Sequence, residues 1–231
     1  MPNRPIRLLT ANLLNGRADP AALARLLRER EIDVAALQEL GDEQAAAVAE
    51  VLPFGKLEPA DDYNGMGIAL RRPAEVRRLP LRFRDARVTE LSPAEWPSLA
   101  APLEVMNLHI QPPHSLPPWA SLLRRRDQLR AVAAYLAAVP RDHRVVAGDL
   151  NATPRWPVYR QLAALVPDAV ERHAREQGHR PPLTWGPWPG APRLLRIDHV
   201  LAHGVRVVHC ETVAIRGSDH HGVLVEVLAE E

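Results

Sequence analysis

Near its end the chain reads Arg196-Ile197-Asp198-His199-Val200 and then Ser218-Asp219-His220-His221-Gly222. Each stretch places an Asp-His pair at the edge of an apolar run. Two related places lie upstream, at Leu37-Gln38-Glu39 and Gly148-Asp149-Leu150-Asn151. Carboxylates at the ends of otherwise buried strands are costly unless they bind a metal or take part in chemistry. Four such places in one chain, with histidine partners, are typical of a metal-assisted hydrolase.

Strand-like and helix-like patterns interleave around these four places. Apolar runs predict strands at residues 6–14, 33–40, 67–71, 76–83, 103–110, 144–150, 197–203, 205–215 and 223–229. Helices are predicted from Asp19-Pro20 onward and at 42–52, 119–139 and 157–165, with loops at 91–101 and 180–193. The longest of these helices carries, on one side, Leu122, Leu123, Leu129, Val132 and Leu136.

This interleaving predicts a single domain over residues 1–231, of α/β (α+β) class, with mixed sheets and helices outside them. The three closing strands follow one another closely, which indicates some antiparallel pairing. Hydrophobic residues make up 46% of the 231 residues, enough for a sizeable core.

The bulk charge and the cysteine count exclude several classes of protein. A formal net charge of +1 gives no global field that would draw the protein onto nucleic acid or acidic membranes. Lys56 is the only lysine; the arginine skew could serve phosphate recognition or reflect compositional bias. The single cysteine, Cys210, excludes an internal disulfide and fits a small core residue in a reducing compartment. No signal peptide and no run of about 20 apolar residues is visible, so a soluble, cytoplasmic protein is expected.

Two of the motifs offer oxygen ligands and a water-orienting pair. Glu39 leaves a buried strand at its carboxyl end and is well placed to hold a hard divalent cation; alternatively it is a solvated residue opening a loop. Asp149 and Asn151 stand two apart, so they point the same way. They could orient a water and donate to an oxyanion, or they could form an Asx turn before Thr153-Pro154.

The remaining motifs suggest a catalytic pair and supporting polar groups. A charge at Asp198 needs a partner, and Asp219-His220 supplies one, because an Asp fixes the tautomer of a His in catalytic dyads. The alternative for Asp198 is an ion pair with Arg196. His109 could donate to a phosphoryl oxygen or be a satisfied core residue. Asn12 could support a metal site or bond only to the backbone.

In their order and spacing, these motifs resemble those of the endonuclease/exonuclease/phosphatase superfamily over nearly the full chain. The matching residues are Asn12, Gln38-Glu39, Asn107-Leu108-His109, Gly148-Asp149-Leu150-Asn151, Arg196-Ile197-Asp198-His199-Val200 and Ser218-Asp219-His220. The resemblance implies a four-layer sandwich in which two mixed β-sheets pack face to face with helices on the outside. It also implies cleavage of phosphoester bonds with Mg²⁺ or Mn²⁺.

The same resemblance implies a role for each motif. Glu39 resembles the principal metal ligand with Asn12 beside it, and Asp219 resembles an accompanying metal or water ligand. Asp149 and Asn151 resemble the pair that orients the attacking water and binds the phosphoryl group. Asp198 and His220 resemble the catalytic Asp-His pair. His109 resembles the histidine that contacts the phosphate in the deoxyribonuclease, deadenylase and lipid-hydrolase branches.

Two departures count against one branch of that superfamily. The abasic-endonuclease branch usually has Tyr where this chain has His109, and often an acidic or amide residue where it has Leu14. Both departures argue against a repair enzyme that resembles exonuclease III.

The sequence therefore predicts a divalent-metal-dependent phosphodiesterase that acts on a phosphodiester substrate, with a DNA or RNA nuclease as the leading hypothesis. The arginines of residues 71–87 or of Arg124–Arg126 could hold nucleic-acid phosphates, or could be solvated faces. Trp185 and Trp188 could wall the pocket or belong to the core. Two alternatives stay open: a small-molecule or lipid-headgroup phosphodiesterase or phosphatase of the same fold, and a non-catalytic binding module.

Overall fold

The computed structural model describes residues 4–113 and 118–229. Its strands are β1 (Ile6–Asn12), β2 (Val34–Gln38), β3 (Phe54–Glu58), β4 (Met66–Leu70), β5 (Val76–Leu79), β6 (Ala86–Leu91), β7 (Leu103–His109), β8 (Arg144–Asp149), β9 (Asp198–His203), β10 (Val205–Ala214) and β11 (His221–Ala229). Its helices are α1 (Pro20–Glu29), α2 (Asp42–Ala49), α3 (Pro118–Ala138), α4 (Pro157–Leu165) and α5 (Ala169–Glu176).

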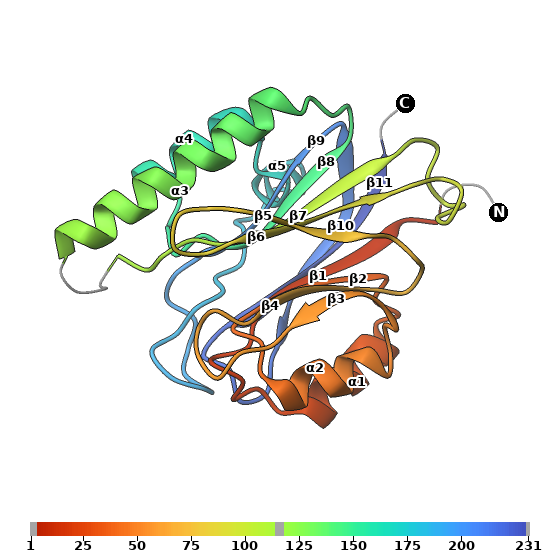
Figure 1. The fold of residues 1–231 in the computed structure, drawn as a ribbon, viewed down its shortest axis with the longest axis horizontal. Coiled ribbons are helices and arrows are strands. Elements are labelled where there is room, and N and C mark those ends of the chain that lie inside the picture. Colours follow the sequence, from red (N-terminus) through yellow and green to blue (C-terminus); the bar gives the residue numbers. More distant parts are fainter. Residues whose placement is uncertain (1–3, 114–117, 230–231) are drawn as a thin grey trace.

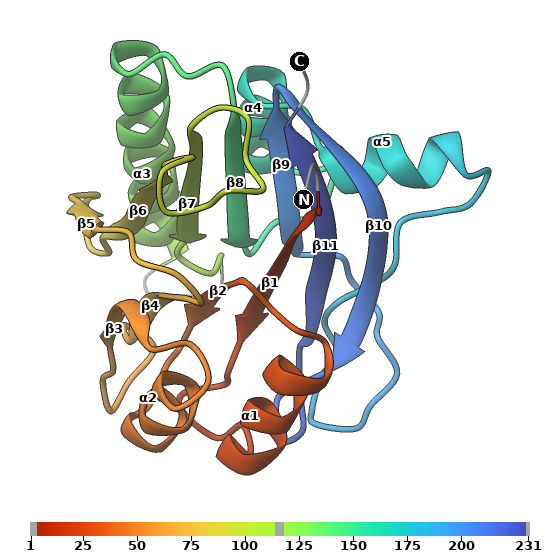
Figure 2. The ribbon, with the colours of Figure 1, turned by 90° about the vertical axis from the view of Figure 1, so that its right-hand side faces the viewer.

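The strands form two mixed sheets that pack against each other. The six-stranded sheet has the order β10-β11-β1-β2-β4-β3, and the five-stranded sheet has the order β5-β6-β7-β8-β9. Helices α1 and α2 cover the outer face of the first sheet, and α3 and α4 cover the outer face of the second (Figures 1 and 2). The predicted four-layer α/β sandwich is confirmed, and so is the antiparallel pairing of β10 with β11.

Side-chain alternation explains why the central strands read as continuous apolar runs. On β1, Leu8 points into the core between the sheets, while Leu9 points into the core under α1 and α2. On β8, Val145 faces the core between the sheets and Val146 faces α3 and α4. Successive residues of a strand face opposite sides, so strands covered on both faces are apolar at almost every position.

Several helix termini follow the sequence signals closely. The carboxylate of Asp19 accepts a hydrogen bond from the backbone N–H of Ala22 at 3.0 Å, and Pro20 occupies the first turn of α1. Helix α4 has the predicted bounds. Among the described residues, no helix combines the length and apolar character needed to cross a membrane.

Other sequence predictions were wrong in detail. Residues 76–83 do not form one strand: β5 ends at Leu79, and a separate strand, β6, begins at Ala86. Strand β3 and helix α5 were not predicted. Strand β3 is a mostly exposed edge strand without an apolar run, and α5 has its amino-terminal cap at Asp168. Leu122 and Leu123 do not belong to the buried side of α3, because both are exposed.

The strand directions bring the polar motifs to one edge of the sandwich. Strands β1 and β2 run parallel, with Asn12 opposite Gln38, and β7 and β8 run parallel, with His109 opposite Asp149. Strand β9 is antiparallel to β8 and begins at Asp198, opposite Asp149. The carboxyl ends of β1, β2, β7 and β8 and the start of β9 therefore lie at the same edge.

Candidate active site

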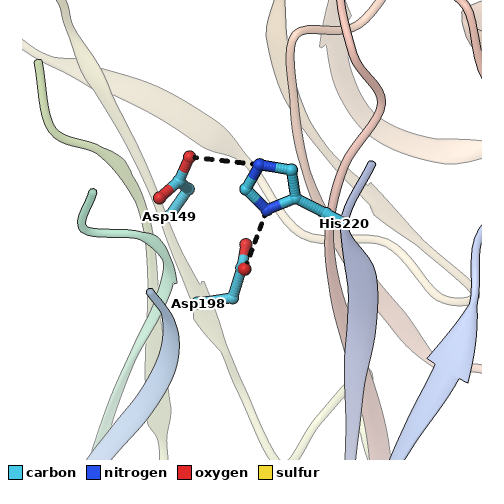
Figure 3. Close-up of side chains that lie close together, drawn as sticks. All are labelled: Asp149, Asp198 and His220. Carbon is cyan, nitrogen blue, oxygen red and sulfur yellow. Dashed lines mark hydrogen bonds and ion pairs between the residues drawn. The ribbon is translucent and has the colours of Figure 1, made fainter. Parts of the chain in front are cut away.

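The side chains predicted to carry chemistry do converge at this edge. Asp149, Asp198 and His220 are all buried, and a ligand atom from each lies within 4.8 Å of the others (Figure 3). Asp149 comes from the end of β8, Asp198 from the start of β9, and His220 from the residue before β11. Two carboxylates and an imidazole thus meet at the junction of the two sheets.

Asn12 joins the two halves of the site. Its amide nitrogen donates to Glu39 Oε1 and to Asp149 Oδ2, both at 3.1 Å. Its amide oxygen accepts the backbone N–H of Leu14 at 2.9 Å. The other oxygen of Glu39 accepts the backbone N–H of Asn15 at 2.9 Å. Asn12 is therefore more than a residue bonded to backbone: it holds a carboxylate of one sheet against a carboxylate of the other.

The backbone turns sharply as it enters the site. Glu39 has φ of 54° and Asn151 has φ of 47°, in the left-handed region that residues other than glycine seldom occupy. At Asn151 the turn is held by Asp149, whose Oδ1 accepts the Asn151 backbone N–H at 2.7 Å. Such strained positions persist where the surrounding structure fixes them and cluster at functional sites. Here the strain turns both side chains toward the carboxylate cluster.

Asp198 and His220 form the expected hydrogen-bonded pair. His220 Nδ1 lies 2.8 Å from Asp198 Oδ2, which leaves Nε2 turned toward Asp149 Oδ2 at 4.0 Å (Figure 3). Burial alone lowers the pKa of His220, but the charge of Asp198 and its hydrogen bond outweigh burial and raise that pKa to about 9. Thr184 Oγ1 accepts the backbone N–H groups of Ile197 and Asp198, which fixes the start of β9.

Asp219 faces the same cluster and is held by a tryptophan. Trp185 Nε1 donates to Asp219 Oδ2 at 3.0 Å, and Asp219 Oδ1 lies 3.9 Å from His220 Nε2. Trp185 therefore belongs to the wall of the site rather than to the core. Trp188 is exposed and has no such contact among residues 4–113 and 118–229.

His109 lies between the carboxylates of the two sheets. Its Nε2 is 3.6 Å from Glu39 Oε1 and 3.7 Å from Asp149 Oδ2, and neither ring nitrogen has a hydrogen-bond partner within the part of the chain that the structure describes. Burial, together with the charges of Arg84 and His220, holds the pKa of His109 well below its usual value. A neutral ring can still donate through one nitrogen. His109 is thus not a satisfied core histidine.

Asn151 uses its amide nitrogen within the loop that follows β8. That nitrogen donates to Asp149 Oδ2 and to the backbone carbonyl of Ile110, each at 3.0 Å. The alternative interpretation of this motif, a turn stabilised by Asp149, is therefore present as well. The same two residues form the turn and line the site.

Two arginines near the cluster were not singled out individually by the sequence. Arg84 is buried; burial lowers its pKa, and the charges of Glu39 and Asp149 act in the opposite direction. Its Nε and Nη1 atoms have no hydrogen-bond partner among the described residues. Burial lowers the pKa of Arg125 to about 10, against the charge of Asp149. The charge of Asp149 therefore acts on both of these buried cations.

Most of the other arginines in the predicted basic cluster are occupied elsewhere. Arg78 and Arg87 pair with Glu58, and Arg82 pairs with Asp127. Arg71 lies 3.3 Å from Asp33, and Arg77 lies 3.9 Å from Glu104. Most arginines of the segment 71–87 are therefore held in ion pairs, and among the described residues only Arg72 and Arg84 of this cluster lack one.

The donor atoms of the site suit a hard divalent cation. Carboxylate oxygens predominate, and Asp198 Oδ1 and Asp219 Oδ1 are buried with no hydrogen-bond partner in the described ranges. Burial, followed by the charge of Asp198, raises the pKa of Asp149 well above its usual value, and a ligand oxygen of Asp198 lies within 4.8 Å of one of Asp149. Mg²⁺ and similar cations prefer oxygen ligands, and such an ion would relieve the crowding. The residues present therefore fit a divalent metal.

Comparison with known proteins agrees with this geometry. The model of the endonuclease/exonuclease/phosphatase family matches residues 9–220. Among curated proteins, none matches the chain. Similar solved structures include an endonuclease/exonuclease/phosphatase from Beutenbergia cavernae, with a TM-score of 0.72, 21% identity, and coverage of 99% of this chain and 72% of that one.

Two further structures show the same fold. The endonuclease/exonuclease/phosphatase from Bacteroides vulgatus has a TM-score of 0.72 at 16% identity, with 99% of this chain and 100% of that chain covered. The TDP2 protein of D. rerio, complexed with a single-strand DNA product, has a TM-score of 0.70 at 18% identity, with 97% and 99% covered. At these identities the likeness establishes the fold.

Proposed function

Because the chain belongs to the endonuclease/exonuclease/phosphatase family, whose members are hydrolytic phosphoesterases, we propose that it is a divalent-metal-dependent phosphodiesterase, and specifically a nuclease that cleaves DNA or RNA with Mg²⁺ or Mn²⁺. The observation that carries the proposal is the convergence at one edge of buried Asp149 and Asp198 with half-buried Glu39 and Asp219, beside a histidine that Asp198 holds. A structural role alone gives no reason to crowd these carboxylates at one edge.

Each residue has a defined part in the proposed reaction. Glu39 and Asp219 would hold the cation, with Asn12 fixing the position of Glu39 through its amide nitrogen. When bound, such an ion neutralises phosphoryl charge and helps the leaving oxygen depart. His109, as a neutral donor, can contact a phosphoryl oxygen, and Arg84 can place its free guanidinium edge against the same anion.

The attacking water has two candidate proton acceptors within the site. One is Asp149, whose Oδ1 and Oδ2 are held by the backbone N–H and the side chain of Asn151. The other is His220, which Asp198 holds with Nε2 turned toward Asp149; with its pKa raised to about 9, this ring accepts a proton only in its minor neutral form and otherwise acts as a proton donor or a positive charge. We propose that one of these two groups takes the proton of a water that attacks in line.

A substrate panel tests the proposal. Double-stranded DNA, single-stranded DNA, RNA and bis(p-nitrophenyl) phosphate are incubated with Mg²⁺ or Mn²⁺, with EDTA as the control. Hydrolysis of a nucleic acid that EDTA abolishes is expected. Activity on the small ester alone would favour the small-molecule or lipid-headgroup hypothesis instead, and activity on none of them would favour a binding module.

A pair of glutamate substitutions tests the metal site. Glu39→Gln is expected to lower metal-dependent activity by about 100-fold or more, because it removes a carboxylate ligand. Glu43→Gln, on the exposed first turn of α2, is the matched control and should behave as wild type. Mn²⁺ binding followed by titration calorimetry gives a readout independent of activity. Unchanged Mn²⁺ affinity in Glu39→Gln would remove Glu39 from the metal site.

A further inference from the structure

Three partly exposed aromatic side chains lie on loops at the same edge as the carboxylates. Tyr63 is in the loop before β4, Phe83 in the loop between β5 and β6, and Trp156 in the loop after β8, with 48%, 51% and 38% of their surfaces exposed. Each loop adjoins the site, because Met66 pairs with Gln38, Arg87 pairs with Asn107, and β8 ends at Asp149.

An arginine stacks on each of these rings. The guanidinium of Arg84 lies 4.6 Å from the ring centre of Tyr63, that of Arg124 lies 4.5 Å from Phe83, and that of Arg125 lies 5.7 Å from Trp156. Arg84 follows Phe83 directly, and Arg125 follows Arg124, so the contacts form one continuous series. We call these six residues, from Tyr63 to Trp156, the arginine–aromatic arc.

In charge pairing, the arginines of the arc differ from the neighbouring Arg78, Arg82 and Arg87. Within the described residues, Arg84, Arg124 and Arg125 have no ion pair with a carboxylate at 4.0 Å or less, whereas Arg78, Arg82 and Arg87 do. Arg125 donates to the backbone carbonyl of Gln111, which fixes its position. The arc is thus a row of cations without ion-pair partners among the described residues, and the charge of Asp149 acts on both of its buried members.

A groove beside the arc adds space for a ligand. It has a volume of about 480 Å³ and is lined on one side by Leu81, Phe83 and Arg84, and on the other by residues such as Pro59 and Asn64 of the loop that carries Tyr63. The acidic groups in its wall, Glu58 among them, are paired with Arg78 and Arg87. Its free positive charge is therefore that of Arg84.

We propose that the arginine–aromatic arc binds single-stranded nucleic acid and leads its phosphodiester backbone into the catalytic site. Unpaired bases stack on exposed aromatic and guanidinium planes, and the backbone phosphates meet the unpaired arginines. A duplex keeps its base faces inside the helix and cannot use half-exposed rings in this way. The inference rests on the proposed nuclease function and adds the substrate class to it.

The arrangement of apolar groups argues against a lipid surface as the occupant. The rings are separated by cations around the site instead of forming one continuous apolar patch of the kind that inserts into a bilayer. The most exposed apolar residues near α3 are Trp119, Leu122 and Leu123, and none of them stacks with an arginine of the arc.

The test compares arc variants with an aromatic residue outside the arc. Tyr63→Ala, Phe83→Ala and Trp156→Ala are each expected to raise KM for a fluorescent 12-nucleotide single strand by about tenfold, the order expected when one stacked base is lost. The loss on this oligonucleotide should exceed the loss on bis(p-nitrophenyl) phosphate by a similar factor. Phe54→Ala is the matched control, because Phe54 is 43% exposed and lies opposite Leu70, at the end of β4 away from Tyr63.

Salt dependence gives a second, independent readout. For single strands, log Kobs falls with log salt by about 0.7 for each phosphate neutralised. Arg124→Gln should therefore reduce the slope by about 0.7, whereas Arg78→Gln, whose partner is Glu58, should leave the slope as in wild type. Circular dichroism of each variant checks that it is folded.

The possible outcomes separate the two proposals. If wild type cleaves duplex as well as single strands, or if the Phe83 and Tyr63 variants keep wild-type KM, the arc proposal is overturned and the nuclease function stands. If no nucleic acid is cleaved but the small ester is, both proposals fail together. Arc-dependent co-sedimentation with phosphatidylserine vesicles, without binding of the single strand, would identify a membrane surface and overturn the arc proposal as well.

Discussion

Strand β9 separates two buried Asp–His contacts, and the difference between them distinguishes a structural network from the proposed catalytic one. On one face, Asp198 contacts His220 at 2.8 Å. On the other face, the next residue, His199, has Nδ1 3.4 Å from Asp168 and Nε2 2.8 Å from the backbone carbonyl of Ala152. Asp198 and His199 are neighbours in the strand, and strand alternation therefore puts their contacts on opposite faces.

The two networks differ in charge balance. Asp168 is satisfied within the protein by Arg196 at 2.5 Å, by Tyr159 Oη at 2.9 Å and by the backbone N–H of Glu171 at 2.8 Å. Burial alone would raise the pKa of Asp168, but the contact with His199 and the charge of Arg196 hold it well below its usual value.

The proposed catalytic network, around Asp149, Asp198 and His220, is less completely paired. Burial and the charge of Asp198 raise the pKa of Asp149, and Asp198 Oδ1 has no partner among the described residues. A buried carboxylate that is fully paired, as Asp168 is, rigidifies the fold, whereas a site with surplus negative charge and an unpaired carboxylate oxygen needs a partner from outside. We therefore expect substitutions on the His220 face to affect activity and those on the His199 face to affect stability.

The largest expected effect is on catalysis. His220→Gln should lower kcat/KM by about 10²–10⁴-fold, because it removes a group held for proton transfer or charge stabilisation. His199→Gln is the matched substitution on the opposite face, and its activity per folded molecule should stay close to wild type. Equal losses of activity in the two variants, at equal folded fractions, would abolish the distinction between the faces.

The next effect is on stability. Asp168→Asn keeps a residue that can cap α5 but leaves Arg196 buried without its counter-charge, so the free energy of unfolding should fall by about 3–5 kcal/mol. Asp198→Asn removes a charge where negative charge is in surplus but also weakens the contact with His220, so the free energy of unfolding should fall by only about 1–2 kcal/mol. Urea unfolding in EDTA measures both. A larger loss in Asp198→Asn than in Asp168→Asn would reverse the assignment of the two networks.

The sequence predicts the catalytic face better than the structural one. An apolar run that ends in Asp149 and another that begins around Asp198, with Ser218-Asp219-His220 nearby, leave few ways to bury those charges, and the contact of Asp198 with His220 is confirmed. Arg196, the alternative partner of Asp198, instead contacts Asp168, because it precedes β9 and turns to the other face. Asp168 lies 28 residues from Arg196, so the sequence does not indicate their contact. Asp168 and Glu171 do form a recognisable helix-capping signal, but that signal predicts only the start of α5.

The arginines show where sequence reasoning stops. Arg82, Arg84 and Arg87 have similar local contexts, yet Arg82 contacts Asp127, Arg87 contacts Glu58, and only Arg84 of the three is turned toward the carboxylates. These partners come from α3 and β3, so the pairing is decided by tertiary packing. Strand β3 itself carries no apolar periodicity, which is why neither it nor the role of Glu58 could be predicted.

A smaller effect should appear in the dependence of stability on pH. Because the pKa of Asp168 is lower in the folded protein than the value of about 4 expected in the unfolded chain, its stabilising contribution is complete above pH 4. That contribution, about 2 kcal/mol, is lost as the pH falls below 4 toward the folded-state pKa. Urea unfolding from pH 6 to pH 3 should show this loss in wild type and a flatter profile in Asp168→Asn. Parallel profiles would mean that Asp168 is not the titrating group.

The smallest predicted effect is a gain in stability, and it tests the surplus negative charge directly. The raised pKa of Asp149 means that its ionised form is disfavoured in the folded protein at neutral pH. Asp149→Asn removes that charge but loses acceptor capacity toward the amides of Asn12 and Asn151, so the net gain in unfolding free energy in EDTA should be about 1 kcal/mol, with activity lost.

Asp142→Asn, on the exposed bend before β8, is the matched control and should leave stability within about 0.5 kcal/mol of wild type. Added Mn²⁺ should stabilise wild type more than Asp149→Asn, because the ion relieves a repulsion that the variant lacks. A variant less stable than wild type in EDTA would show that the carboxylates are balanced without an outside partner, and the two faces of β9 would then not differ in the way proposed.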